Sequence, residues 1–211
     1  NLFKDKEYLI LVGGSGLYAD SVIYGIDEFP EIPDKIRDKI TREYKDKGIS
    51  YLQEELKKLD KEYYKIVDIK NQSRIIRALE IIKFTGSKFS SLRKHTKKKR
   101  EFKTKVVLLE CSREVLYNKI NRRVDVMISN GLEEEAFKLQ KHSNLNTLNT
   151  VGYKEFFDYF ENKLSYDDAI DKIKQNTRNY AKRQITWLKK YKNSKKINIE
   201  KINEIDLNKI I

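Results

Sequence analysis

The sequence has 211 residues, of which 36% are charged, and its formal net charge is +13. This length is enough for one domain with an insert or for two small domains, and the positive charge favours an anionic partner, either a nucleic acid or an acidic lipid. The single cysteine, Cys111, excludes an internal disulfide and fits a reducing compartment. No apolar run approaches the length of a membrane span and no signal-peptide pattern opens the chain, so we expect a cytoplasmic protein without a membrane partner.

Residues 8–18 predict a strand, a glycine turn and a helix in succession. The apolar run 9–12 is typical of a strand that is buried on both faces of a parallel sheet. In the turn Gly13, Gly14, Ser15 and Gly16, three residues lack a Cβ, so backbone N–H groups can approach a ligand closely. Such a turn lies at the mouth of an open α/β sheet, where ligands usually bind. A tight strand–helix turn without a ligand explains the pattern equally well.

The glycine turn is not a nucleoside-triphosphate P-loop. That motif reads G-x-x-x-x-G-K-[ST], and no lysine follows Gly16. A parallel strand also needs neighbours, and only one other convincing strand is predicted, at 106–109. We therefore expect the front of this domain to lie upstream of Asn1.

Residues 28–96 predict a helical insert. Pro33 fits the first turn of a helix that ends at Gly48, Ser50 caps the next, and a third begins at residue 71 or 73 and ends at Gly86. The basic run 97–105 is typical of a solvated linker, although it could also contact a phosphate backbone.

The chain then returns to the core. After the strand 106–109, Ser112 caps a helix that ends before Gly131. The next helix begins with three acidic residues, 133–135. Ser165 caps a helix that extends to about residue 192, and a short strand and a last helix are expected from Ile197 onward. The expected division is core 1–27, insert 28–96, and core return with C-terminal helices 97–211.

The helix from Ser112 places one arginine in an apolar stripe. At about 100° per residue, with Leu116 at zero, Ile120 falls at about 40°, Val124 at about 80° and Arg123 at about −20°. A guanidinium on the core side must be hydrogen-bonded, either to a carboxylate of the protein or to a ligand phosphate. Arginine suits phosphate because it donates two parallel hydrogen bonds. The sequence allows either a carboxylate of the protein or a ligand phosphate as this partner.

Basic residues also follow one face of the helix from Ser165, at Lys174, Arg178, Lys182 and Lys189, with Trp187 near its end. This face could follow a phosphate backbone or simply be solvated. In the insert, Arg74 and Arg77 share a helix face, which suits RNA contacts, although Glu80 could pair with Arg77. No cluster has metal-ligand spacing, and no serine or cysteine nucleophile with a paired base is apparent.

Five segments form an ordered set of motifs: V-G-G-S-G-L-Y at 12–18, R-I-I-R-A-L-E at 74–80, R-V-D-V-M at 123–127, G-Y-K at 152–154 and A-K-R-Q-I-T-W at 181–187. Together they resemble one family, the tRNA dimethylallyltransferases, also called tRNA isopentenyltransferases. The resemblance implies an α/β fold, part of a P-loop NTPase-like parallel-sheet core with an α-helical insertion domain that grips the anticodon stem-loop. We expect these 211 residues to be predominantly helical. We expect a monomer.

The resemblance implies transfer of the dimethylallyl group of dimethylallyl diphosphate to the exocyclic amine of an adenosine beside the tRNA anticodon. The adenosine is flipped out, Mg²⁺ accompanies the diphosphate, and an aspartate acts as general base. Arg123 then has the catalytic role of offsetting leaving-group charge, and Gly13, Gly14 and Ser15 bind substrate. The implied tRNA-binding residues are Ser15, Arg37, Ser73, Arg74, Arg77, Asn149, Gly152, Tyr153, Lys154, Lys182, Arg183, Gln184, Trp187 and Lys189.

Parts of the family pattern are absent from the 211 residues. The P-loop, the aspartate base and the adjoining D-S segment all precede the V-G-G turn, so the Mg²⁺ site is expected there. We expect that these residues alone bind dimethylallyl diphosphate poorly and do not catalyse. Ser15 stands where many members have threonine, and Asn149 where some have arginine. One alternative is a non-catalytic basic RNA-binding module. The other is a P-loop phosphotransferase, and the R-V-D-x-M and K-R-Q-x-T-W motifs argue against this second alternative.

Overall fold

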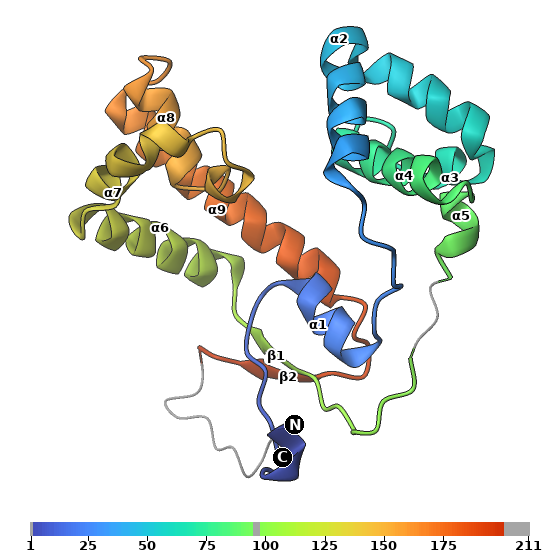
Figure 1. Cartoon of the computed structure of the whole chain (residues 1–211). Coiled ribbons are helices and arrows are strands. Elements are labelled where there is room, and N and C mark those ends of the chain that lie inside the picture. The colour runs from blue at the N-terminus through green and yellow to red at the C-terminus, as the bar shows by residue number, and fades with distance from the viewer. Residues whose placement is uncertain (1, 95–97, 201–211) are drawn as a thin grey trace. The chain divides into compact units, whose positions relative to one another are not determined.

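The chain forms two compact units in a computed structural model that describes residues 2–94 and 98–200 (Figure 1). The unit that we call the sheet unit contains the residues before Leu17 and those from Lys103 onward, and the helical unit contains Leu17–Phe102. Residues 17–27 and 98–102, which we placed in the core segments, therefore group with the helical unit. The functions assigned to the three predicted segments stay predictions.

The helical unit carries most of α1 (Gly16–Ile23) and all of α2 (Asp34–Leu59), α3 (Lys61–Ile66), α4 (Gln72–Thr85) and α5 (Phe89–Leu92). The two helices predicted on either side of Gly48 form one element, α2, which is kinked at Gly48 because that residue has a φ of 76°. The side chain of Asn71 caps α4 by accepting a hydrogen bond from the N–H of Arg74 at 3.2 Å, and Gly86 ends this helix with a φ of 70°.

The core of the helical unit lies between α2 and α4. Ile40, Leu52 and Leu56 of α2 and Ile75 and Leu79 of α4 have no solvent exposure. Leu52 and Leu56 are four residues apart, as are Ile75 and Leu79, so each pair lies on one helix face, and α2 packs against α4 through these residues. This core fixes the positions of the polar side chains at its edge.

One lysine joins α4 to both halves of the kinked helix. The Nζ atom of Lys83 lies 3.0 Å from a carboxylate oxygen of Glu43 and 3.7 Å from one of Glu55. Glu43 precedes Gly48 and Glu55 follows it, so the two ion pairs span the kink. All three side chains are more than two-thirds buried, which reduces the screening of the pairs by solvent.

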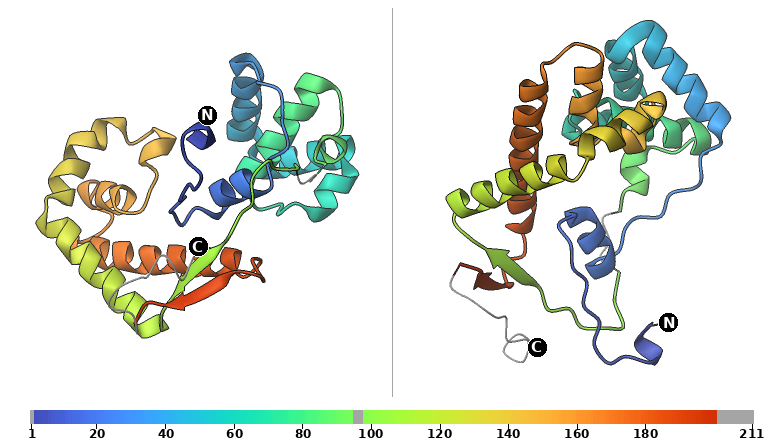
Figure 2. Two further views of the ribbon diagram at one scale, coloured as in Figure 1. Left: turned by 90° about the horizontal axis from the view of Figure 1, so that it is seen from below. Right: turned by 90° about the vertical axis from the view of Figure 1, so that its left-hand side faces the viewer.

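The sheet unit contains a two-stranded parallel sheet and the helices that follow its strands. Strand β1 (Val107–Glu110) pairs with β2 (Lys195–Asn198), with Leu109 opposite Ile197. The two strands lie side by side in both views (Figures 1 and 2). The remaining elements are η1 (Leu2–Lys4), α6 (Arg113–Ser129), α7 (Leu132–Leu139), η2 (Gln140–His142), η3 (Asn146–Leu148), α8 (Tyr153–Phe160) and α9 (Tyr166–Leu188).

Local signals set the ends of these helices as predicted. The hydroxyl of Ser112 accepts a hydrogen bond from the N–H of Val115 at the start of α6, and that of Ser165 accepts one from Asp168 at the start of α9. Gly131 separates α6 from α7 with a φ of 93°. The apolar cluster of this unit surrounds Phe156 of α8, which is completely buried.

The prediction of a buried strand at 9–12 is wrong. These residues form no strand, and Val12 is 86% exposed. A strand is stabilised by hydrogen bonds to a neighbouring strand, and the sheet formed by the described residues contains only β1 and β2. The predicted strand 106–109 is confirmed as β1, but Leu109 is 58% exposed, so this strand is not buried on both faces. The predicted last helix lies outside the described residues after Glu200.

The observed architecture is therefore mostly helical with a small parallel sheet, as expected for this part of an α/β fold. Within residues 2–94 and 98–200, no helix is both long and apolar enough to cross a membrane.

Candidate nucleic-acid interface

The glycine turn lies directly against the second half of α9. A Cβ built on Gly14 would lie 2.1 Å from Nε2 of Gln184, and one built on Gly16 would lie 2.2 Å from Cδ1 of Trp187. Real Cβ contacts are never so short, so the approach depends on the missing side chains. Gly13 has open space instead, with nothing within 4 Å. Two segments that are about 170 residues apart are thus brought together, and both were predicted to bind substrate or RNA.

Replacing Gly16 with alanine is expected to displace the indole of Trp187. The backbone of Gly16 has no positive φ, so alanine adds the steric conflict without backbone strain. Trp187 is the only tryptophan in the chain, so its fluorescence emission and its quenching by acrylamide report the displacement directly. Gly13→Ala is the matched control and should leave both unchanged. Identical spectra for the Gly16→Ala variant and the wild type would contradict the contact.

The C-terminal part of α9 and the residues just after it present cations beside aromatic rings. Lys182, Arg183, Thr186, Trp187 and Lys190 line an open depression of 660 Å³. The Nζ atom of Lys190 lies 4.2 Å from the centre of the Trp187 ring, and the guanidinium of Arg183 lies 5.5 Å from that of Tyr180. Such a surface can stack a base and contact a phosphate. Sequence reasoning missed Lys190, which its position three residues after Trp187 could have indicated.

The predicted continuous basic face of α9 is wrong in its first half. The Nζ atom of Lys174 lies 2.6 Å from Oδ1 of Asp125, and Nη1 of Arg178 donates a hydrogen bond to Oδ1 of Asn121 at 2.7 Å. These two cations join α9 to α6 and do not face solvent as a row. Asp125, for which the sequence indicated no role, therefore helps to hold the two helices together. Lys182 and Lys189 remain exposed.

Arg123 is exposed, so its predicted place on the core side of α6 is wrong. The helix buries Ile120 and Val124, and the direction midway between them lies about 80° from Arg123 on the helical wheel. No hydrogen bond or ion pair holds its guanidinium within the described part of the chain. The side chain is therefore open to an anion from outside the chain, and its catalytic role stays a prediction.

The segment 149–154 divides into residues that serve the fold and residues that face solvent. Gly152 is buried with a φ of 107°, and its N–H donates to the buried carboxylate of Glu155 at 2.8 Å. The other oxygen of Glu155 accepts a hydrogen bond from Asn176 at 2.7 Å. Sequence reasoning missed Glu155, although an acidic residue beside two phenylalanines is a detectable signal.

Tyr153 also serves the fold. Its hydroxyl donates to the Glu135 carboxylate at 2.6 Å, and this hydrogen bond raises the pKa of Tyr153 because it stabilises the protonated phenol. Asn149 and Lys154 are exposed and are the members of this segment that can reach an RNA.

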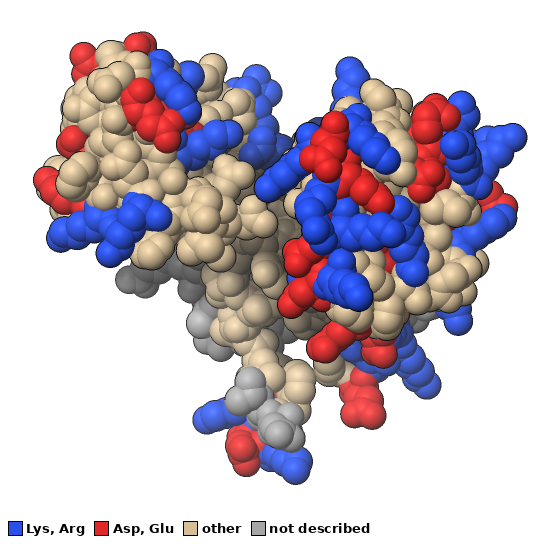
Figure 3. All heavy atoms as spheres, turned by 45° about the horizontal axis from the view of Figure 1, so that its top comes forward, with Lys and Arg blue, Asp and Glu red and all other residues tan. Residues whose placement is uncertain are grey.

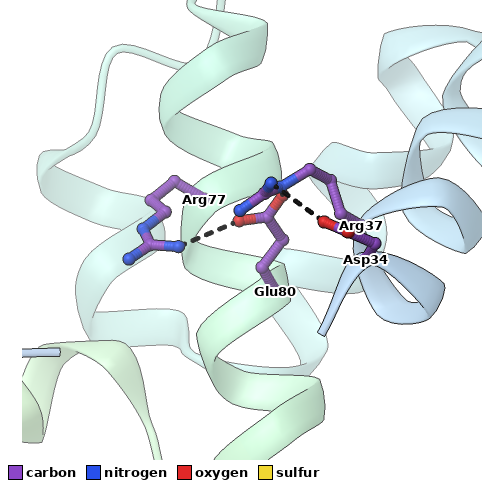
Figure 4. Close-up of polar contacts among 4 residues, drawn as sticks. All are labelled: Asp34, Arg37, Arg77 and Glu80. Atoms are coloured by element: carbon purple, nitrogen blue, oxygen red, sulfur yellow. Dashed lines mark hydrogen bonds and ion pairs between the residues drawn. The ribbon is translucent and has the colours of Figure 1, made fainter. Parts of the chain in front are cut away.

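In the helical unit, two predicted RNA-binding arginines converge on one buried carboxylate (Figure 4). Nη1 of Arg77 donates to Oε2 of Glu80 at 3.2 Å, which confirms the pair anticipated from the sequence, and Nε of Arg37 lies 3.4 Å from Oε1. About half of each arginine side chain is exposed. Ser73 and Arg74 are exposed nearby on α4.

The surface of the helical unit is not uniformly basic. Lys and Arg alternate with Asp and Glu on the face of the α2–α5 lobe, at the right of Figure 3. The net positive charge of the chain therefore does not by itself mark an RNA-binding face on this unit.

The resemblance places the implied Mg²⁺ site in the P-loop segment that precedes the glycine turn, outside these 211 residues. The described part of the chain contains no group of three or more His, Cys, Asp or Glu side chains placed to hold a metal ion. No chemical role through Mg²⁺ is assigned to these residues.

Comparison with known proteins identifies the family. A model of the IPP transferase family matches residues 1–191. The tRNA dimethylallyltransferase of Christiangramia forsetii is 47% identical over 189 residues, which are 90% of this chain and 63% of that protein. The full-length tRNA isopentenylpyrophosphate transferase of Bacillus halodurans has a TM-score of 0.53 and 32% identity, covering 92% of this chain and 60% of that one.

A third comparison supports the fold alone. A eukaryotic dimethylallyltransferase that was crystallised acting on tRNA has a TM-score of 0.64 at 24% identity, covering 88% of this chain and 50% of that one. The chain thus spans a little under two thirds of the length of the curated relatives it matches. With a family match from the first residue to Tyr191, the chain belongs to the IPP transferase family.

Proposed function

We propose that the protein containing this chain transfers the dimethylallyl group from dimethylallyl diphosphate to the exocyclic amine of the adenosine beside a tRNA anticodon. The observation that carries the proposal is the family match over residues 1–191 together with relatives named tRNA dimethylallyltransferase. The packing of the glycine turn on Gln184 and Trp187 supports it, because it joins a predicted substrate-binding turn to a predicted RNA-binding helix.

In this proposal the two units divide the RNA contacts. Arg37, Ser73, Arg74 and Arg77 of the helical unit hold the anticodon stem-loop. In the sheet unit, Ser15, Asn149 and Lys154 and the exposed residues of α9 contact the loop around the target adenosine. Flipping this adenosine out of the stack exposes its amine to the prenyl donor, which a stacked base could not do.

Arg123 receives the diphosphate in this proposal. Negative charge builds up on the diphosphate as the bond to the dimethylallyl carbon breaks, and a guanidinium beside it stabilises that charge. The exposure of Arg123 and its lack of a partner in the described part of the chain agree with this role. Gly13, Gly14 and Ser15 lie in the same unit, and their backbone N–H groups can approach the bound substrate closely.

We further propose that the protein acts as a cytoplasmic monomer with a P-loop-type core, and that Mg²⁺ accompanies the diphosphate. No G-x-x-x-x-G-K-[ST] motif occurs in the 211 residues. By themselves these residues are therefore expected to bind RNA but not to transfer the prenyl group.

A titration of the 211 residues with an anticodon stem-loop at two salt concentrations tests the RNA half of the proposal. Contact with about six phosphates predicts that the association constant falls about 1,000-fold between about 50 and 200 mM salt. A duplex RNA without the loop serves as the control and should bind more weakly. Salt-independent binding, or no preference for the stem-loop, would count against an anticodon-binding surface.

A non-catalytic RNA-binding module is the second candidate. The cations beside aromatic rings on α9 favour it as much as they favour an enzyme, because stacking and phosphate contact need no catalysis. Transfer of a labelled dimethylallyl group to tRNA by the full-length protein decides between the two candidates.

A further inference from the structure

Glu80 fixes two arginines from different helices as a pair. Its side chain is only 6% exposed, and each of its oxygens faces one guanidinium, Arg37 of α2 and Arg77 of α4. A buried carboxylate that loses its cations becomes an uncompensated charge in a poor solvent. Losing either arginine would leave part of the Glu80 charge unpaired, which favours keeping both guanidiniums beside Glu80 (Figure 4).

A second carboxylate contacts the same cluster from the solvent side. Oδ1 of Asp34 lies 3.4 Å from Nη1 of Arg37, and the Asp34 side chain is 87% exposed. Asp34 lies in the first turn of α2, where an acidic residue is favourable whatever it contacts. An ion pair this exposed is weak because water screens it and holding two mobile side chains together is unfavourable.

The two carboxylates therefore have different roles around Arg37. Glu80 is buried and pairs with both arginines, whereas Asp34 is exposed and, among the described residues, pairs with Arg37 alone. Arg37 and Arg77 each carry five N–H donors, most of which the two carboxylates leave unused. With two arginines and two acidic residues, the cluster is close to neutral until Asp34 moves away.

We propose that Asp34 occupies the position on Arg37 that a phosphate of the RNA takes, so that Asp34 is an internal competitor for RNA binding. The inference rests on the proposed function, in which Arg37 and Arg77 hold the anticodon stem-loop. When RNA binds, its phosphate replaces the Asp34 carboxylate at Nη1 of Arg37. Glu80 is a positioning residue that keeps Arg37 and Arg77 as a paired phosphate site throughout.

The experiment compares two variants that remove the same charge from the same helix. Asp34→Asn removes the competitor, and Asp38→Asn is the matched control, because Asp38 is exposed one turn later and its side chain pairs with nothing in the described part of the chain. Affinity of the purified protein for a labelled anticodon stem-loop is measured at low and moderate salt. Thermal unfolding is followed in parallel, since Asp34 also interacts with the helix dipole.

Asp34→Asn is expected to tighten stem-loop binding about 3- to 5-fold at low salt, whereas Asp38→Asn changes it less than about twofold. The gain should disappear when Arg37→Met is present as well. Equal effects of Asp34→Asn and Asp38→Asn would overturn the inference, and so would a gain that persists with Arg37→Met. If the wild-type protein does not bind the stem-loop at all, the proposed function itself fails, and that outcome is distinct from the other two.

Discussion

Arg123→Ala in the full-length protein is expected to slow dimethylallyl transfer by about 100- to 1,000-fold while leaving tRNA affinity within about threefold of the wild type. The side chain is exposed on α6 and has no internal partner in the described residues, so its removal leaves no buried charge unpaired. What is lost is a cation beside the departing diphosphate. Single-turnover transfer of labelled dimethylallyl groups and a separate tRNA-binding titration give the two quantities.

Arg122 provides the control for this experiment. It is the neighbouring residue, is also exposed and carries the same charge, but it lies about 100° away around the helix. Arg122→Ala should therefore leave the transfer rate within a few-fold of the wild type. If both variants lose transfer and tRNA affinity to the same extent, Arg123 contributes to general RNA binding and its assignment to the diphosphate is wrong.

Phe156→Ala is expected to lower the free energy of unfolding by about 3–5 kcal/mol, which is a large part of the stability of a small domain. Phe156 has no solvent exposure and lies at the centre of the apolar cluster of the sheet unit. Its ring packs against those of Tyr159, Phe160 and Tyr166 at centroid distances of 6.1–6.4 Å. Alanine would leave a cavity that these large rings cannot fill. Denaturant unfolding followed by circular dichroism measures the change.

Phe137→Ala is the matched substitution for the stability experiment. Phe137 lies on α7 and is 64% exposed, although its ring meets that of Phe160 edge-on at 5.4 Å. Losing this one aromatic contact should lower stability by no more than about 1.5 kcal/mol. Similar losses for the two variants would mean that the cluster is not organised around Phe156.

The sequence predicted best those features that depend on neighbours along the chain. The caps at Ser112 and Ser165 and the helix ends at Gly86 and Gly131 were anticipated, and Asn71 was one of the two starts expected for α4, because each depends on a side chain or a φ angle within one turn. The pair between Arg77 and Glu80 is also a local feature, since two side chains that are three residues apart on a helix lie next to each other.

Features that depend on distant partners were predicted poorly. Residues 9–12 have the composition of a strand, but composition does not supply the neighbouring strand that would pair with them. A helical wheel considers one helix only, so it could not show that Lys174 and Arg178 turn toward α6 or that Arg123 turns away from the core. The contact of Gly16 with Trp187 likewise depends on how the chain returns after about 170 residues.

The ion pairs of Lys83 have a mechanical consequence for the helical unit. A kink at a glycine normally lets the two arms of a helix swing independently, but Glu43 on one arm and Glu55 on the other share a single ammonium group from α4. Arg37 lies on the first arm of α2 and Arg77 on α4, and the Lys83 ion pairs connect these two helices. A nucleic acid bound at either arginine therefore pulls on helices that are held together, which opposes a change in the spacing between the two guanidiniums.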